Sequence, residues 1–160
     1  LAGDFGNLVF RTLSMIDRYF GSVVPEPVGE PAGPLAEAAA PLFADVDAAM
    51  TDLQYSKALE RIWEFVRRAN QYVEERKPWQ LNKDPAGRDK LACTMYHLAE
   101  ACRILGLLVE PTMPATAHAI REQLALPPET RPLNEALAWG GLKPGTRVCR
   151  GEPLFPKKDA

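Results

Sequence analysis

The amino-acid sequence predicts an all-α fold, a bundle of about five helices with a C-terminal tail packed back on it. Apolar residues recur at three- and four-residue steps over several long stretches, which is the spacing of one helix face. Clusters of proline and glycine separate these stretches, and neither a strand-helix alternation nor a repeat is present. The 160 residues, 46% hydrophobic and 25% charged, suffice for one ordinary core.

The first predicted element is an amphipathic helix over residues 1–20. At about 100° per residue, its apolar side chains fall on one broad side. They are Phe5, Leu8, Val9, Leu13, Ile16, Tyr19 and Phe20. Residues 21–34 are rich in proline and glycine and lack periodicity, so we expect a loop. An alanine-rich helix should follow over about 35–53, with Pro41 either near its true start or kinking it.

The segment 55–76 has the strongest helical pattern, and we expect a central helix there because its apolar arc covers about half the circumference. Pro78 stops or redirects the chain, and 81–89 forms a polar turn. A helix over about 88–109 should come next.

A short helix over 115–124 is predicted to follow Pro114, and prolines and glycines break up any long element after it. The apolar residues of the remaining tail suggest that it packs against the bundle. They are Leu142, Val148, Leu154 and Phe155.

The composition argues against several classes of protein. No apolar run approaches the roughly 20 residues that cross a bilayer, and no basic-then-apolar leader opens the chain, so we expect no membrane partner. The cysteines Cys93, Cys102 and Cys149 are odd in number and lack CxxC spacing, which favours a reducing compartment, the cytoplasm. Because the chain begins at Leu1 rather than Met, we expect it to be part of a longer protein.

The common catalytic and nucleotide-binding motifs, GxxxxGKS/T, GxGxxG, HExxH and GxSxG, are absent from the sequence. We therefore predict neither a catalytic site nor a cofactor in this stretch. Cys93 and His97 lie four residues apart on one helical face, but Cys102 lies on the opposite face. No metal site is predicted, because buried cysteines usually act as small hydrophobic residues.

Charge is unevenly distributed along the chain. Residues 21–54 hold six acidic residues and no Lys or Arg, whereas residues 55–90 hold nine basic and six acidic residues. The basic segment is compatible with nucleic-acid binding in spite of the net charge of −2. A different hypothesis is a helical protein-interaction module, whose acidic segment docks a basic partner and whose Trp79 is a buried anchor.

One face of the first helix carries an unusual set of side chains. Asn7 and Arg11 are four residues apart, and Phe10 and Ser14 share their arc. An amide, a guanidinium and an exposed aromatic ring suit the recognition of a nucleotide base. The alternative is that Arg11 pairs with an acidic neighbour while Phe10 packs on a loop.

Trp79 follows Pro78 at a predicted helix end and is surrounded by polar and basic residues. These are Arg76, Lys77, Gln80 and Lys83. A flat ring among positive charges is a platform on which bases of single-stranded RNA stack, while Lys and Arg contact the phosphates. The alternative is a Trp that caps the bundle core.

Several stretches together resemble the bacterial methionyl-tRNA synthetases, in their anticodon-binding domain. They are GNLVFRTLSMI at 6–16, ALERIWEFVRRANQYVEERKPWQLNK at 58–83, RILGLLVEPTMP at 103–114, WGGLKPG at 139–145 and PLFPKK at 153–158. The resemblance covers essentially the whole chain in the family's order. Single motifs such as NLxxR are weak, whereas their ordered combination is specific.

The resemblance implies that residues 1–160 form one anticodon-binding domain of the class I synthetase type, with 125–160 as its tail. In that family the domain follows a Rossmann-type catalytic domain, and the whole enzyme attaches methionine to tRNA using ATP. The family's HIGH-like and KMSKS-like signatures are absent here. ATP, and in some relatives zinc, would belong to that catalytic domain.

The resemblance also implies roles for individual residues. Asn7 and Arg11 match the residues that contact the first base of the CAU anticodon, and Trp79 matches the Trp that stacks on it. Cytosine presents acceptors at O2 and N3 beside the N4 donor, so an Arg can donate while an Asn amide can do either. The implied partners are the methionine tRNA anticodon loop and the parent's catalytic domain, with no DNA.

Further tRNA contacts are expected from four residues near these positions, namely Phe10, Ser14, Lys77 and Lys83. Phe10 departs from the family pattern, because we expect many relatives to carry a polar residue there. It either adds a second stack or packs against a neighbouring helix and shifts Arg11.

Overall fold

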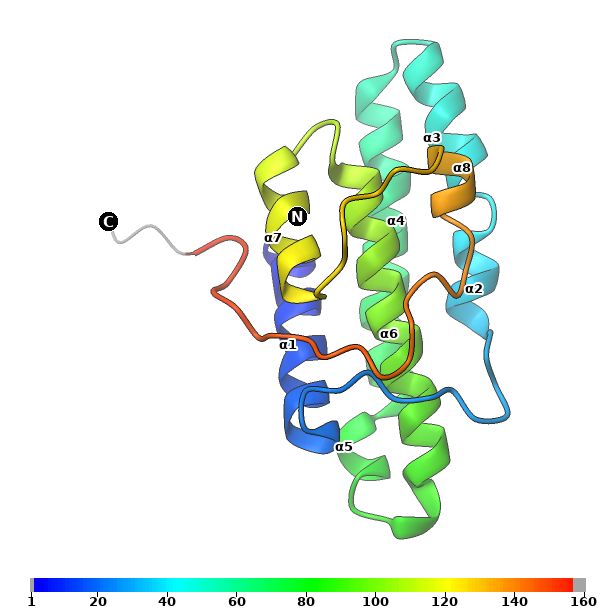
Figure 1. Ribbon diagram of the computed structural model, residues 1–160. Helices are drawn as coiled ribbons and strands as arrows, with labels where there is room; N and C mark the ends of the chain where they lie inside the picture. The colour runs from blue at the N-terminus through cyan, green and yellow to red at the C-terminus, as the bar shows by residue number, and fades with distance from the viewer. Residues whose placement is uncertain (1, 157–160) are drawn as a thin grey trace.

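The computed structural model describes residues 2–156 and confirms the predicted all-α bundle (Figure 1). Its helices are α1 (Ala2–Phe20), α2 (Pro34–Ala39), α3 (Leu42–Thr51), α4 (Tyr55–Arg76), α5 (Pro78–Leu81), α6 (Arg88–Val109), α7 (Pro114–Gln123) and α8 (Leu133–Ala136). The short 3-10 helix η1 (Pro85–Gly87) precedes α6. Within the described residues, α1, α3, α4, α6 and α7 have ten residues or more, which matches the expected number of about five.

The helix at the centre of the bundle is α6, which lies between α1 and α7 on one side and α2 on the other (Figure 1). Of its 22 residues, 18 are buried, including alanines, cysteines and a glycine. Small residues let neighbouring helices approach α6 from several directions. Most of the circumference of α6 is therefore buried, and the helix has no solvent-exposed polar face. The expectation that α4 occupies the central position therefore requires correction, because α4 keeps an exposed side and packs beside α6.

Most predicted boundaries agree with the structure, and the clearest exception is the second helix. The expected helix over 35–53 is divided into α2 and α3, which meet at Pro41. Proline has no N–H for helical hydrogen bonding, and its ring clashes with the preceding turn, so α2 ends before it and α3 begins after it. Pro41 thus breaks the helix and does not merely bend it. The short helices α5 and α8 were not expected.

One segment, Pro85–Val109, is long and apolar enough by length and composition to cross a membrane. This finding contradicts our expectation that no apolar stretch of the chain is long enough to cross a bilayer. In the structure, 94% of its most apolar stretch is buried inside the protein, and the core helix of a soluble protein passes the same test. Burial of this kind is what its position at the centre of the bundle requires.

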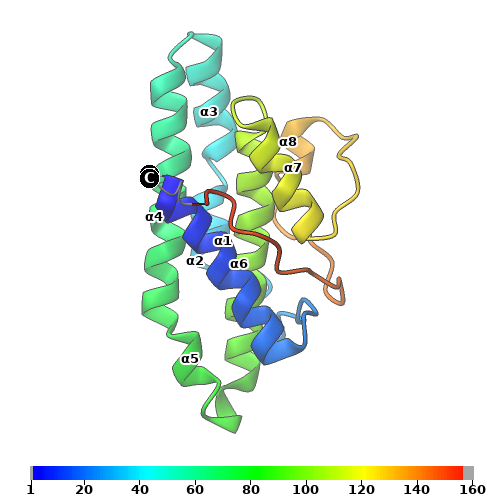
Figure 2. The ribbon, with the colours of Figure 1, turned by 90° about the vertical axis from the view of Figure 1, so that its left-hand side faces the viewer.

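The C-terminal tail packs back on the bundle, as predicted, and crosses over α1 (Figure 2). Its expected apolar contacts are present, with Leu142 and Val148 buried and Leu154 and Phe155 packed against the core. An isolated antiparallel bridge joins Val23 to Arg147, so the tail also pairs with the loop after α1. The last four residues of the expected tail, 157–160, lie outside the described residues.

Candidate nucleic-acid interface

The surface of α1 presents the predicted side chains as expected from the helical period. Asn7 and Phe10 are exposed and Arg11 is half-buried, whereas the apolar side of the helix is buried in the core. The hydroxyl of Ser14 donates a hydrogen bond of 2.7 Å to the carbonyl of Phe10, one turn before it. Phe10 is not part of the core, because the residue is 37% exposed.

Trp79 is positioned by a sharp change of direction between α4 and α5. Lys77 adopts a left-handed conformation (φ 47°), and its N–H caps α4 by donating to the carbonyl of Val73. Pro78 then starts α5, a position where its fixed φ and missing N–H are tolerated. The adjacent Trp79 is half-buried and packs against the core with part of its surface.

These two elements meet at a shallow surface cavity of about 200 Å³. It is lined by Phe10, Arg11, Ser14, Met15 and Arg18 from α1 and by Trp79 from α5. Residues separated by more than 60 positions in the sequence thus share one surface. Two aromatic rings and two guanidinium groups around a shallow cavity provide stacking surfaces and hydrogen-bond donors together.

The structure brings four of the seven predicted site residues to this cavity, namely Phe10, Arg11, Ser14 and Trp79. Asn7 lies one turn from Arg11 on the same face of α1, but it is not part of the lining. Lys77 and Lys83 are exposed on either side of α5 and also lie outside the lining. Their contribution to a site would come from long, mobile side chains at its margin.

Arg11 already has a partner in the structure. Its guanidinium donates a hydrogen bond of 3.1 Å to the carboxylate of Glu74 on α4, and the two side chains are 33% and 62% exposed. The alternative considered from sequence, an ion pair with an acidic neighbour, is therefore present. Exposed pairs of this kind contribute little to stability. Arg11 can consequently exchange Glu74 for a ligand at small energetic cost.

Three further residues at this surface were not predicted: Met15, Arg18 and Arg150. Arg18 lies seven positions, about two helical turns, after Arg11, so helical spacing contained enough information to find it. Arg150 comes from the tail, and its guanidinium carbon lies 5.5 Å from the centre of the Phe10 ring. No local pattern in the sequence indicates that contact.

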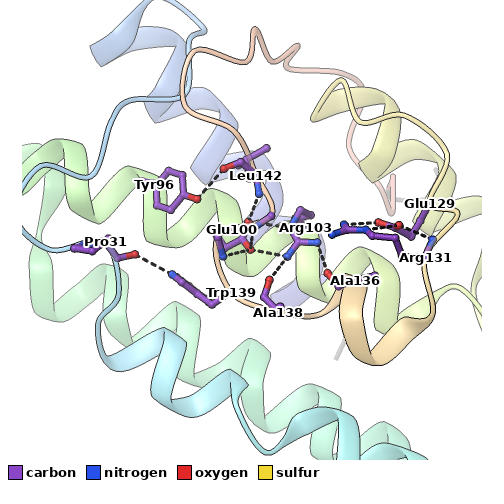
Figure 3. A network of polar contacts seen from close by, with 12 residues as sticks. Pro31, Tyr96, Glu100, Arg103, Glu129, Arg131, Ala136, Ala138, Trp139 and Leu142 are labelled. Carbon is purple, nitrogen blue, oxygen red and sulfur yellow. Dashed lines mark hydrogen bonds and ion pairs between the residues drawn. The ribbon is translucent and has the colours of Figure 1, made fainter.

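The tail that carries Arg150 is anchored by a buried charged network on α6 (Figure 3). The carboxylate of Glu100 accepts hydrogen bonds from the guanidinium of Arg103 at 2.6 and 2.9 Å and from three backbone N–H groups of residues 140–142 at 2.9 to 3.0 Å. Arg103 in turn donates to the carbonyls of Ala136 and Ala138. Both charges are thereby paired and hydrogen-bonded, as burial requires.

Gly141 is needed for this network because no side chain fits at its position. A Cβ atom there would lie 2.5 Å from the guanidinium carbon of Arg103. On the other side of the loop, the hydroxyl of Tyr96 donates to the carbonyl of Leu142 at 2.7 Å. Burial raises the pKa of Tyr96 to about 12, so this donor keeps its proton.

The residues considered as metal ligands have other partners. The thiol of Cys93 donates to the carbonyl of Val28, and His97 lies between the hydroxyl of Tyr72 and the carbonyl of Glu30, 2.8 Å from each. Because a carbonyl only accepts, Nε2 of His97 donates to it and Nδ1 accepts from Tyr72. Within the described part of the chain, no three potential ligands form a cluster.

The acidic segment 21–54 is partly engaged within the protein. Glu30 pairs with Arg76 at 2.9 Å, and Asp45 pairs with Arg61. Two of its six acidic residues thus have internal partners, which weakens the hypothesis of an acidic surface that docks a basic protein.

Comparison with known proteins identifies the relatives of this chain. The family model described as the anticodon-binding domain of methionyl tRNA ligase matches residues 26–160. Methionine–tRNA ligases of Caldanaerobacter subterraneus and Bacillus subtilis are 44% and 38% identical over 99% and 100% of the chain. The chain spans about a quarter of the length of these relatives, 25% and 24%.

The fold also matches solved structures. The free form of methionyl-tRNA synthetase from Mycobacterium tuberculosis superposes with a TM-score of 0.90 at 31% identity, over 100% of this chain and 33% of that one. The form of the same enzyme bound by methionyl-adenylate gives a TM-score of 0.87 over 98% of this chain. The family match includes Trp79, and the full-length relatives extend the similarity to α1.

Proposed function

Because this chain belongs to the family of methionyl-tRNA ligase anticodon-binding domains, we propose that it recognises the CAU anticodon of methionine tRNA. Trp79 stacks on the first anticodon base, a cytosine. Arg11 donates to the O2 or N3 acceptors at the edge of that base, and Asn7 contacts it from the adjacent turn of α1. The observation that carries the proposal is the shared cavity of Arg11 and Trp79.

The proposal assigns different tasks to the charged and the aromatic groups. A base stacked on Trp79 contributes affinity of roughly 1–3 kcal/mol, with little regard to base identity. Discrimination then comes from hydrogen bonds at the base edge, because a purine in this position presents a different pattern of donors and acceptors. Arg18, Lys77 and Lys83 contribute to phosphate binding around the cavity, and Ser14, which lines it, makes a further contact to the RNA.

We further propose that the chain acts as part of a longer methionine–tRNA ligase in the cytoplasm. The charging of tRNA with methionine and the use of ATP are assigned to a catalytic domain outside this chain, and in some relatives zinc belongs there as well. That catalytic domain is the second proposed partner, and neither DNA nor a membrane is a partner. The relatives' names support the proposal that the chain is part of a longer methionine–tRNA ligase, since all three are methionine–tRNA ligases or synthetases.

Binding to stem-loop RNAs tests the proposed function directly. A stem-loop carrying CAU and two loops with altered first or second anticodon bases are compared by mobility shift at several stated salt concentrations, because phosphate contacts alone bind all three. We expect preference for CAU to persist as salt rises. Equal binding of the three loops would contradict anticodon recognition and leave only general RNA affinity.

Substitution of Arg11 tests whether this residue is responsible for the preference for CAU. Arg11→Ala should reduce the preference for CAU. Arg67→Ala, which removes an exposed cation of α4 outside the cavity, should weaken the binding of all three RNAs slightly or not at all. Circular dichroism of both variants checks that helicity is retained. Retained preference in a folded Arg11→Ala protein would show that the base edge is not recognised by this residue.

A further inference from the structure

Phe10 shares the cavity with Trp79, and the guanidinium of Arg150 lies over the Phe10 ring. The residue Phe10 is 37% exposed, and the Arg150 guanidinium carbon lies 5.5 Å from the centre of its ring. We infer that this pair binds a second nucleotide base, adjacent in the RNA to the one that stacks on Trp79. The inference rests on the proposed function, and it adds a binding position that the carried-over roles of Asn7, Arg11 and Trp79 do not include.

The position of Phe10 on α1 supports a role outside the core. Its neighbours Leu8, Val9, Thr12 and Leu13 are buried, so α1 has enough inward-facing residues without it. A single exposed aromatic residue is ordinary on a protein surface. This one differs because it lines a cavity together with a second aromatic residue, Trp79, and because a cation from a distant part of the chain lies over its ring.

The backbone on both sides of Arg150 is held in place. The N–H of Val148 donates to the carbonyl of Ser22, and the N–H of Cys149 donates to the carbonyl of Gln123, both at 2.8 Å. Beyond Arg150, the amide of Gln123 donates to the carbonyl of Glu152 at 3.2 Å. The exposed side chain of Arg150 therefore extends from a fixed backbone, which reduces the entropy lost when it binds a ligand.

The chemistry of the pair favours a nucleotide over other ligands. Bases stack on aromatic rings and on guanidinium planes, and a guanidinium also pairs with phosphate through several N–H groups. The cavity adds Arg11 and Arg18 from α1, and Arg150 of the tail contacts Phe10, one of the residues that line it. A single-stranded loop that places one base on Trp79 presents its neighbouring base and phosphate within this arrangement. An acidic peptide would use the cations but leave both aromatic faces without stacking partners.

The test uses the full 160-residue chain and CAU stem-loops in which one loop base at a time is replaced by an analogue whose fluorescence falls when it stacks. Pyrrolocytosine, which keeps the cytosine O2 and N3 acceptors, replaces the first anticodon base, and 2-aminopurine replaces a neighbouring base. In the unmodified protein we expect quenching at two neighbouring positions. Trp79→Ala should restore fluorescence at the first position, and Phe10→Leu should restore it at the second. Phe10→Leu should also weaken binding roughly fivefold or more, because each stacked base contributes substantially to affinity.

Two substitutions of Arg150 separate stacking from charge. Arg150→Lys keeps the charge and loses the plane, so it should weaken binding nearly as much as Arg150→Gln. Arg147→Gln removes a neighbouring exposed cation of the same tail and should change binding much less. If Arg150→Lys binds like the unmodified protein, Arg150 serves only as a charge and the stacking pair is refuted.

The outcomes distinguish this inference from the proposed function. Preference for CAU and loss of quenching in Trp79→Ala, with unchanged quenching and affinity in Phe10→Leu, would overturn the second position and leave anticodon recognition intact. Absence of any preference for CAU in the unmodified protein would overturn both. Thermal unfolding of Phe10→Leu provides the folding control, and we expect its midpoint to be unchanged because the ring is partly exposed.

Discussion

Two Arg–Glu pairs in this domain have the same chemistry and opposite properties. Arg103 and Glu100 are 4% and 0% exposed, whereas Arg11 and Glu74 are 33% and 62% exposed. The buried pair receives three additional backbone N–H groups and donates to two backbone carbonyls. The exposed pair rests on one hydrogen bond of 3.1 Å. A fully surrounded pair holds the fold together, while a loosely held one leaves its Arg available to a ligand.

The largest effect should follow from breaking the buried pair. Glu100→Gln keeps the shape of the side chain but leaves the buried charge of Arg103 uncompensated, so the free energy of unfolding should fall by about 3–5 kcal/mol. Urea unfolding followed by circular dichroism measures it. Arg131→Gln breaks an exposed pair with Glu129 and serves as control, with an unchanged midpoint expected. Equal stability of the two variants would refute the distinction between the pairs.

The next largest effect concerns RNA binding at the exposed surface. Trp79→Ala should weaken binding of the CAU stem-loop by about 1–3 kcal/mol, because it removes the stacking platform. Trp79→Phe keeps an aromatic ring and should recover part of the affinity. Both are measured by fluorescence anisotropy at a temperature where circular dichroism shows folded protein. A folded Trp79→Ala variant with full affinity would rule out stacking at this position.

A smaller effect should appear when the pH is lowered. Burial lowers the pKa of His97 below its ordinary value of 6.5, and Nδ1 accepts from Tyr72, so the folded protein favours the neutral ring. The unfolded chain binds a proton near pH 6.5, so stability is fully present above that pH and is lost as the pH falls below it. Nearby charges on Glu30 and Arg76 act in opposite directions on this pKa.

Thermal unfolding between pH 7.5 and 5.5 measures this dependence. His97→Gln keeps an amide that can donate to the carbonyl of Glu30, and it should flatten the pH dependence while lowering stability at neutral pH. An unchanged slope in this variant would assign the pH dependence to other groups.

The smallest effect is expected from the exposed partner of Arg11. Glu74→Gln should change the free energy of unfolding by less than about 1 kcal/mol, since both side chains are solvated. RNA affinity should stay the same or rise slightly at low salt, because a negative charge beside the cavity is removed. A loss as large as that of Arg11→Ala would mean that Glu74 positions Arg11 for binding, and the ion pair would then be part of the site.

The elements of the bundle were predictable where the local pattern was strong. The predicted limits 55–76 and 88–109 coincide with α4 and α6. Strong apolar spacing and the following Pro78 define α4, and Gly87 and Pro111 flank α6. For Pro41 the sequence left two alternatives, a helix start or a kink, and the division into α2 and α3 was not predicted because the short helix α2 has too few residues to show a periodic pattern. The central position of α6 was missed because small buried residues on all sides weaken its periodicity.

The sequence by itself determined the helical class and the residues on the exposed arc of α1, and its ordered motifs pointed to Trp79 and to the family. Those features depend on local periodicity and on the order of residues along the chain. Only the tertiary structure decided that Arg11 pairs with Glu74, that Arg150 lies on Phe10 and that Glu100 holds the tail. These contacts join residues 40 to 140 positions apart, and their energies depend on burial and geometry that arise when the helices pack.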